Sequence, residues 1–196
     1  MVVSLLAATA GTALAFTVGY IVYRTRSIAR GALESVSMVP HVVLAIGLLW
    51  TWLIMPLPVY GTLWILVIGF VVVQMPQGFR GIAASIRATD RDLEDSAVML
   101  GARRGRAIVS ITLPLMRAAV LSTFMLLLML SMRELTVPLF LYTTDTQLLS
   151  ITIYDQFENG GTLREASATA LIYCAIMFLL SYLPRRLGAK NGGSGV

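Results

Sequence analysis

The chain has few residues that could form a metal site, a redox pair or a covalent intermediate. It contains one cysteine, Cys174, and one histidine, His41. A disulfide framework, a C-x-x-C redox pair or a Cys/His metal site needs several such residues from one chain. We therefore expect no metal, cofactor or disulfide site made by this chain alone, and we expect Cys174 and His41 to be packing residues.

The sequence also lacks the motifs of nucleotide hydrolysis and nucleophilic catalysis. The stretch from Gly101 to Arg106 is not followed by the Lys-Ser/Thr of a G-x-x-x-x-G-K-[ST] phosphate loop. There is no aspartate pair and no Ser/His or Cys/His set suited to catalysis. We therefore do not expect an enzyme, and an intramembrane enzyme is the weaker alternative.

Arg133 and Glu134 are adjacent ionisable residues inside an otherwise apolar stretch. Ionisable groups at membrane depth are costly and usually face a cavity, a partner or the interface. Neighbouring residues on a helix do not face each other, so a simple ion pair between these two is not expected. Two interpretations stay open: one of them lines or gates a path near the outer side, or both occupy an outer-interface position and serve packing.

The composition places these residues in a membrane protein. Hydrophobic residues make up 57% of the 196, charged residues only 13%, and the mean hydropathy is +0.81. A soluble globular domain needs a more polar surface than this. We therefore expect an all-α integral membrane protein. The net charge of +5 points to loop asymmetry rather than to nucleic acid.

Five apolar stretches are long enough to be membrane spans. A helix needs roughly 20 residues to cross a hydrocarbon core of about 30 Å. The uncharged segment from Ser35 to Phe79 must fold back on itself, and Pro56-Leu57-Pro58 with Gly61 marks the turn. In the first span, small residues recur every four positions and predict close helix packing: Ala7, Gly11, Ala15 and Gly19. The expected spans are 1–23, 36–55, 61–79, 118–142 with a polar break, and 166–184.

The basic residues predict the orientation of the spans. Thirteen of the 15 lysines and arginines fall in segments that share one side: 24–30, 80–117 and 185–190. Cytoplasmic loops carry such an excess. We therefore expect the N-terminus outside and the C-terminus inside, with residues 188–196 forming a disordered cytoplasmic tail.

The cytoplasmic loop at about 80–116 is too long and too amphipathic to be a simple linker. Thr89 or Asp90 can cap a helix over 90–101, and Thr89 with Asp92 fits a capping box. Gly101 suits a left-handed residue that ends the helix. Acidic residues fill its first turns, where the helix dipole is positive, and an apolar stripe follows them: Asp92, Glu94 and Asp95, then Leu93, Ala97 and Leu100.

A second amphipathic stretch follows the turn and reaches Leu113-Pro114, with the proline suited to the first turn of the next membrane helix. The loop is therefore expected to be a helix-turn-helix lying against the membrane. Arg103, Arg104 and Arg106 suit anchoring to anionic headgroups better than specific pairing with a nucleotide-hydrolysing partner.

This loop resembles the E-A-A-x3-G-x9-I-x-L-P motif of permease subunits of type I binding-protein-dependent ABC importers. Asp95 replaces Glu and Ser96 replaces Ala, so neighbouring Glu94 is a second candidate for the acidic role. The likeness in helix layout extends over residues 1–187, which would form the type I transmembrane domain. The residues at the motif positions are Asp95-Ser96-Ala97, Gly101, Ile111 and Leu113-Pro114.

The resemblance implies that the motif forms a coupling helix that docks on a separate ABC ATPase subunit. It further implies a second permease half or subunit, an extracytoplasmic (periplasmic) solute-binding protein, and location in the bacterial cytoplasmic (inner) membrane. A helix resting on membrane lipid is the alternative interpretation of the loop. The residues assigned to the ATPase interface are Leu93, Glu94, Asp95, Ser96, Ala97, Leu100, Gly101, Ile111, Leu113 and Pro114.

Permeases of this family usually have six helices per subunit, so with five spans we expect an N-terminally truncated form. Residues 1–187 resemble the second half of the iron permeases that carry two halves in one chain. Short segments resemble iron(III) permeases most, with 2-aminoethylphosphonate, polyamine and thiosulfate relatives close behind: Met132-Arg133-Glu134-Leu135, Leu141-Tyr142-Thr143-Thr144 and Ile153-Tyr154-Asp155.

The outer loop from Thr143 to Glu165 is the expected docking surface for the binding protein. A non-transporting membrane scaffold or truncated permease remnant that keeps the docking loop is the alternative function. A self-contained channel would leave the motif spacing unexplained.

Overall fold

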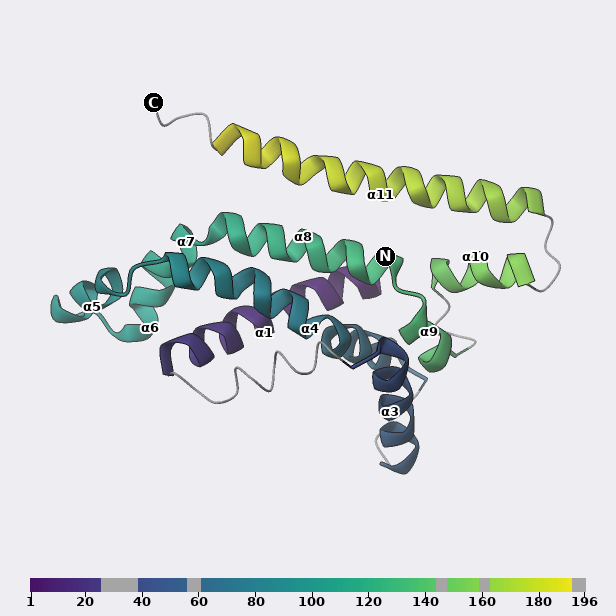
Figure 1. Cartoon of the computed structure of the whole chain (residues 1–196), viewed down its shortest axis with the longest axis horizontal. Coiled ribbons are helices and arrows are strands. Elements are labelled where there is room, and N and C mark those ends of the chain that lie inside the picture. The colour runs from purple at the N-terminus through teal and green to yellow at the C-terminus, as the bar shows by residue number, and fades with distance from the viewer. Residues whose placement is uncertain (26–38, 56–60, 144–147, 159–162, 192–196) are drawn as a thin grey trace.

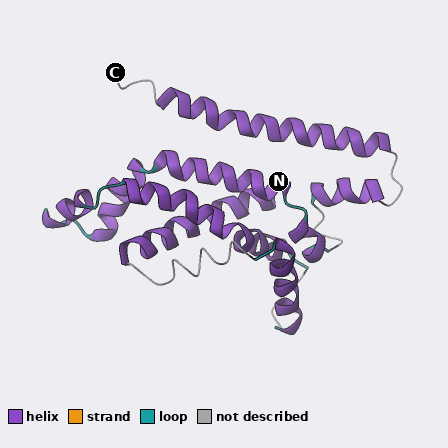
Figure 2. Ribbon diagram, in the orientation of Figure 1, coloured by secondary structure: helices purple, strands orange, loops and turns teal. Residues whose placement is uncertain are grey.

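The computed structural model describes residues 1–25, 39–55, 61–143, 148–158 and 163–191. Within these ranges all regular structure is helical, as Figure 2 shows, which confirms the all-α prediction. Two of the described helices, α1 (Val2–Thr25) and α4 (Leu63–Ala88), are long and apolar enough to cross a membrane. A third crossing results if α8 (Arg117–Arg133) is counted with the bent segment before it, so the number five stays a prediction.

Helices α1, α4 and α8 form the centre of the structure (Figure 1). Gly11 of α1 lies near Val71, and Gly19 lies near Ile82, so α1 and α4 run parallel. Helix α8 runs the opposite way, because its Thr123 lies against Gly81 whereas Ser131 bonds to Gln74. This direction is the one expected for consecutive crossings joined by the loop at 80–116.

Small residues let these helices approach closely. Ala7, Gly11, Ala15 and Gly19 are all buried, which confirms the packing face predicted from their spacing. Helix α4 also has a small residue at this contact. A Cβ added at Gly78 would lie only 3.1 Å from the Ala15 Cβ. Such contacts bring backbones near enough for extensive van der Waals packing, which drives helix association in membranes.

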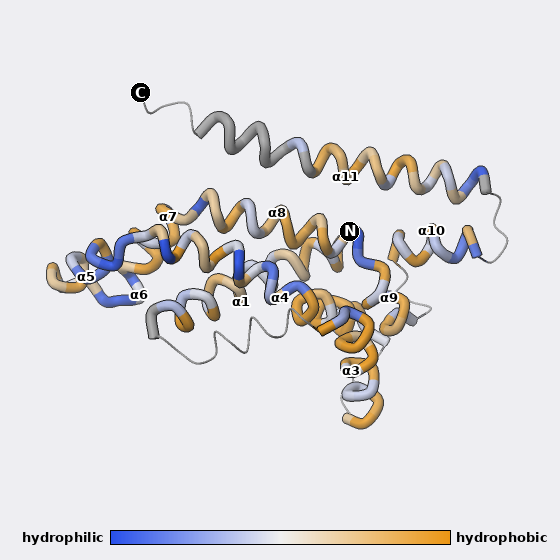
Figure 3. The backbone as a smooth tube through the Cα atoms, in the orientation of Figure 1, coloured by the Kyte–Doolittle hydropathy of each residue, from blue (hydrophilic) through white to orange (hydrophobic). Residues whose placement is uncertain are grey.

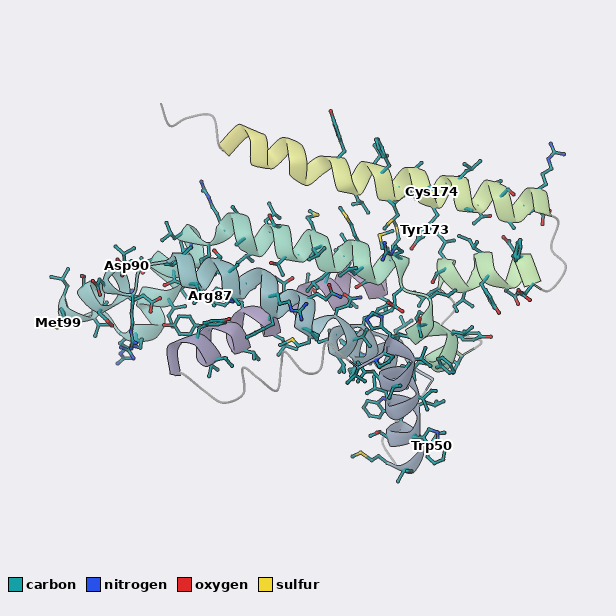
Figure 4. The ribbon with its side chains drawn as sticks, viewed as in Figure 1. Trp50, Arg87, Asp90, Met99, Tyr173 and Cys174 are labelled. Carbon is teal, nitrogen blue, oxygen red and sulfur yellow. The ribbon has the colours of Figure 1, made fainter. Side chains whose placement is uncertain are left out.

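One end of the α1–α4 pair carries an aromatic and cationic contact. The Tyr23 ring stacks on Phe79 at a centroid distance of 5.8 Å. The guanidinium of Arg87, labelled in Figure 4, lies 5.0 Å from the centroid of the same tyrosine ring. These contacts hold α1 and α4 together where the chain leaves the bundle toward the loop.

Helix α3 (His41–Ile54) projects away from the bundle in Figure 1. Its 14 residues span about 21 Å at roughly 1.5 Å per residue, less than a full crossing. Ala45 joins α3 to a buried cluster with Phe70 and Val137, the latter from α9 (Thr136–Leu141). The predicted turn at Pro56-Leu57-Pro58 lies outside the described residues, whereas Gly61 has a positive φ of 81°.

The chain ends in α10 (Leu149–Glu158) and the long α11 (Leu163–Asn191). Helix α11 lies beside α8, with Tyr173 and Met177 packed against Leu127 and Leu128. The predicted fifth span lies inside α11, and the helix continues to Asn191; the last residues of the predicted tail, 192–196, lie outside the described ranges. Cys174 is exposed on α11 (Figure 4), so its assignment as a packing residue is wrong.

We predict that Gly69→Ala destabilises the protein while Gly47→Ala does not. A Cβ at Gly69 would lie 2.7 Å from Val137 Cγ1 and 3.0 Å from Leu141 Cδ1, so α9 would have to shift. Overpacking of this kind costs about 1–3 kcal/mol. A Cβ at Gly47 would meet no other described part of the structure within 4 Å, so the same substitution there only raises helix propensity.

The measurement is the thermal unfolding midpoint of each purified variant in detergent. Equal midpoints for the two variants would contradict the packing of α9 on α4.

Candidate functional site

The loop after α4 folds into a short helix, α5 (Asp92–Met99). Asp90 Oδ1 accepts a hydrogen bond of 3.1 Å from the amide of Asp92, the first residue of α5, and Asp90 lies just before the N-cap residue Arg91. The predicted capping box of Thr89 with Asp92 is wrong. The Thr89 hydroxyl donates instead to the Ser85 carbonyl, because Thr89 ends α4 and its side chain turns back toward that helix.

Gly101 reverses the chain direction after α5. Its φ is +94°, a conformation that disfavours residues with a Cβ. The Gly101 amide donates to the Val98 carbonyl at 2.9 Å, and the Ala102 amide donates to the Ala97 carbonyl at 3.0 Å. This pair of bonds is a Schellman motif, so the predicted left-handed end of the helix is confirmed.

One face of α5 is exposed and partly apolar. Leu93 is 47% exposed, Met99 88% and Leu100 90%. Ala97 of the predicted stripe is only half-buried, and Met99, which the periodicity of the stripe omitted, is more exposed than Leu93. Figure 4 shows Met99 at the extreme end of the molecule. A shallow open groove on this face is lined by Asp92, Asp95, Ser96, Met99 and Leu100.

Glu94 does not belong to that exposed face. Its side chain is buried, at 3% exposure, and bonds to hydroxyls of the bundle. Its assignment to an ATPase interface therefore conflicts with where the structure places it. The reason is helical geometry: Glu94 lies about 100° around the helix from Asp95, which turns the two adjacent acids to different sides.

Asp95, at the first motif position, stays half-exposed and pairs within the loop. Its carboxylate lies 3.3 Å from Arg104 Nη2 and 3.7 Å from Arg91 Nε. Arg104 therefore pairs with a residue of its own loop, while its side chain stays largely exposed. Such exposed pairs contribute about 0–1 kcal/mol each, so they orient the loop more than they stabilise it.

The second half of the motif lies after the turn. The chain passes through α6 (Arg104–Ala107), the π-helix η1 (Ile108–Thr112) and α7 (Leu113–Leu115), then bends by 74° into α8. Pro114 is thus the second residue of α7, in the segment before the bend, rather than in the first turn of α8. Leu113 lines a different hollow with Phe16 and Phe124, so the structure does not bring it to the groove on α5.

The sequence polarity agrees with this arrangement. Figure 3 shows hydrophilic residues gathered around α5 and α6 at one end, whereas α3 is largely hydrophobic. The exposed motif residues Ser96 and Gly101 lie at this polar end, and Ile111 is half-buried behind them. The site is therefore a helical turn held beyond the end of the apolar bundle.

The predicted polar break lies at the opposite end of α8. The helix ends at Arg133, Glu134 is extended, and α9 starts at Thr136. Glu134 Oε1 accepts a hydrogen bond of 3.1 Å from the Thr136 amide. The break is therefore confirmed, and Arg133 is exposed while Glu134 is largely buried.

Glu134 meets His41 across the structure. His41 Nδ1 lies 3.2 Å from Glu134 Oε2, and the side chains are 43% and 13% exposed. The expectation that His41 is a packing residue is wrong, because it makes a polar contact that joins the start of α3 to the break after α8. No periodicity in the sequence signals this pair, since the two residues are 93 positions apart.

We predict that Gly101→Ala loosens the turn after α5. Forcing an L-residue into this backbone region costs roughly 1–2 kcal/mol, so amide exchange at residues 101 and 102 should accelerate about 5- to 30-fold. The matched control is Gly105→Ala, where a Cβ meets open space and φ is not positive. Hydrogen–deuterium exchange of the two variants tests this prediction. Unchanged exchange in Gly101→Ala would show that an alanine at this positive φ does not strain the turn.

Comparison with known proteins places the whole arrangement in a family. Residues 9–189 match the family described as "Binding-protein-dependent transport system inner membrane component". The chain is 29% identical over 157 residues to the Salmonella typhimurium protein named "Putative 2-aminoethylphosphonate transport system permease protein PhnV", covering 79% of this chain and 59% of that one.

A second relative is the ferric transport system permease protein FbpB of Actinobacillus pleuropneumoniae. It is 26% identical over 147 residues, which cover 73% of this chain and 21% of FbpB. The chain thus spans about three-fifths of the first relative and a fifth of the second. Because the family match covers most of its length, the chain belongs to the inner-membrane permease components of binding-protein-dependent ABC importers, as the motif predicted.

Proposed function

We propose that the chain is the permease subunit of an ATP-driven importer and that α5 docks on a separate ATPase. With a second permease half or subunit it forms the translocation path, and the ATPase performs all hydrolysis. The observation that carries the proposal is the exposed face of α5, where Met99 and Leu100 are almost fully exposed. A short helix with its other face packed and this face apolar suits a protein groove.

The charge of the same face favours a protein partner over lipid. Asp92 and Asp95 flank the exposed Met99 and Leu100. The cytoplasmic leaflet carries a negative surface potential, which repels carboxylates. A helix that rests on lipid would be expected to present basic residues here, so docking on a protein explains the residue types better.

The same proposal gives the orientation and the outer contacts. The α5 end is cytoplasmic, with the N-terminus of this chain outside and its C-terminus inside, and the break after α8 lies toward the outside. Helix α10 follows that break and exposes Tyr154, Asp155 and Phe157. This exposed surface is the proposed contact for a solute-binding protein.

The substrate class is proposed from the relatives and from the polar contact at Glu134. The PhnV relative is named for 2-aminoethylphosphonate and the FbpB relative for ferric iron. We propose a small polar solute of this kind, delivered by the binding protein. The His41–Glu134 contact joins α3 to the break after α8, so its opening would separate two segments and suits a gate.

We predict that replacing Met99 and Leu100 together by Glu abolishes co-purification of the ATPase and its stimulation by the binding protein. Two charges in a docking groove would leave carboxylates buried without partners, which costs several kcal/mol. The control is Val109→Glu, an exposed apolar residue on the same loop but outside the groove. ATPase turnover of the reconstituted complex is the measurement, and full stimulation in the double variant would refute docking through α5.

We predict that Glu134→Ala lowers uptake without affecting assembly. The change removes the contacts with His41 and the Thr136 amide. Uptake of labelled 2-aminoethylphosphonate and labelled ferric iron is measured at equal permease levels, with Thr51→Ala, an exposed position near the far end of α3, as the control. Normal uptake by the Glu134→Ala variant would contradict a role for Glu134 in the translocation path. Substrate-dependent ATP turnover in the wild type separates an importer from a non-transporting scaffold.

A further inference from the structure

Glu94 is a carboxylate buried at the base of α5, facing away from the proposed docking groove. Only 3% of the residue is exposed. A buried charged group is costly unless hydrogen bonds replace its hydration. The structure supplies such bonds from two membrane-side segments, so the position of Glu94 connects the loop to the bundle.

The first bond runs to α1. Tyr20 Oη donates to Glu94 Oε2 at 2.6 Å, although the two residues are 74 positions apart. Tyr20 directly follows Gly19, whose backbone packs on Ile82 of α4. A displacement of Glu94 would therefore act on the packed pair of α1 and α4.

The second bond runs to the segment that leads into α8. Thr112 Oγ1 donates to Glu94 Oε1, and Thr112 is itself buried. Thr112 is the last residue of the π-helix η1, and only α7 separates it from the 74° bend into α8. π-Helical turns are rare and occur frequently at functional sites. The two carboxylate oxygens of Glu94 thus accept hydrogen bonds from α1 and from the segment that precedes α8.

We infer that Glu94 is the positioning residue that transmits movement of α5 to the membrane helices. This inference rests on the proposed docking of α5 and adds the route by which docking reaches the path. Both oxygens of the Glu94 carboxyl group accept a hydrogen bond, so the side chain cannot move without breaking a bond or moving Tyr20 or Thr112. Asp95 cannot serve this role as placed, because its described partners Arg91 and Arg104 belong to the same loop.

The test uses the complete complex with its ATPase and compares amide exchange with and without a non-hydrolysable ATP analogue. In the wild type, nucleotide changes exchange in α5, α1 and α8. In Glu94→Ala, the ATPase still binds and the change in α5 remains. The change in α1 and α8 shrinks at least roughly fivefold, the lower end of typical coupling between sites. Glu94→Gln, whose Oε1 accepts from one hydroxyl while its Nε2 donates to the oxygen of the other, restores most of the response.

Single hydroxyl deletions keep the inference testable if Glu94→Ala fails to fold. Tyr20→Phe and Thr112→Val each remove one bond and should each weaken the response in α1 and α8. Thr89→Val and Tyr142→Phe are the matched controls, because the Thr89 hydroxyl bonds within its own helix turn and Tyr142 is exposed after α9.

Three outcomes would overturn the inference, and they are distinguishable. A wild-type response in α1 and α8 of Glu94→Ala, or of both single hydroxyl variants, refutes the transmission route alone. Loss of ATPase binding in Glu94→Ala would make Glu94 an interface residue instead. Absence of any nucleotide response in α5 of the wild-type complex would refute the proposed docking itself.

Discussion

The close contact of α1, α4 and α8 is the constraint on which the rest of the structure depends. In a bilayer, apolar side chains gain little by leaving lipid, so helices associate through shape, small residues and polar contacts. Gly78 against Ala15 and Gly81 against Thr123 bring three backbones together with almost no side-chain volume between them. This spacing determines where Tyr20 and Thr112 lie, and so where the loop can attach.

The loop uses the two sides of one short helix for two purposes. The inward side of α5 carries Glu94, whose carboxylate is satisfied by hydroxyls of the bundle. The outward side carries Met99 and Leu100, which are almost fully exposed within the described part of the chain. The turn at Gly101 then returns the chain to the membrane. A helix built this way is firmly held on one side and available to a partner on the other.

The C-terminal end of α8 is followed by a side chain that bonds to the first amide of the next helix. The helix stops at a glutamate rather than at a glycine or proline, and Glu134 then bonds forward to the Thr136 amide. Backbone groups freed inside a membrane need protein partners, and side-chain capping is one way to supply them. The same carboxylate reaches His41, so the break and α3 are linked by one contact. Both ends of α8 therefore depend on a buried or partly buried glutamate.

Local features of the fold and site were predictable because their causes are local. Helical content, the small-residue face of α1, the polar break at Glu134 and the turn at Gly101 follow from composition, spacing and backbone preference. The family followed from a motif with fixed spacing.

Only the tertiary structure decided which partners the polar residues meet. Glu94 and Asp95 are adjacent acids in one helix, yet one bonds to the bundle and the other to the loop. The predicted Thr89 capping box does not form, because the Thr89 hydroxyl donates to a carbonyl of α4 instead. His41 contacts Glu134, which lies 93 positions away in the sequence. By itself the sequence determined the helical class, the break at Glu134, the turn at Gly101 and the family, since these depend on neighbours along the chain. The tertiary structure decided the hydrogen-bond partners, because those depend on how close the packed helices bring residues that are far apart in sequence.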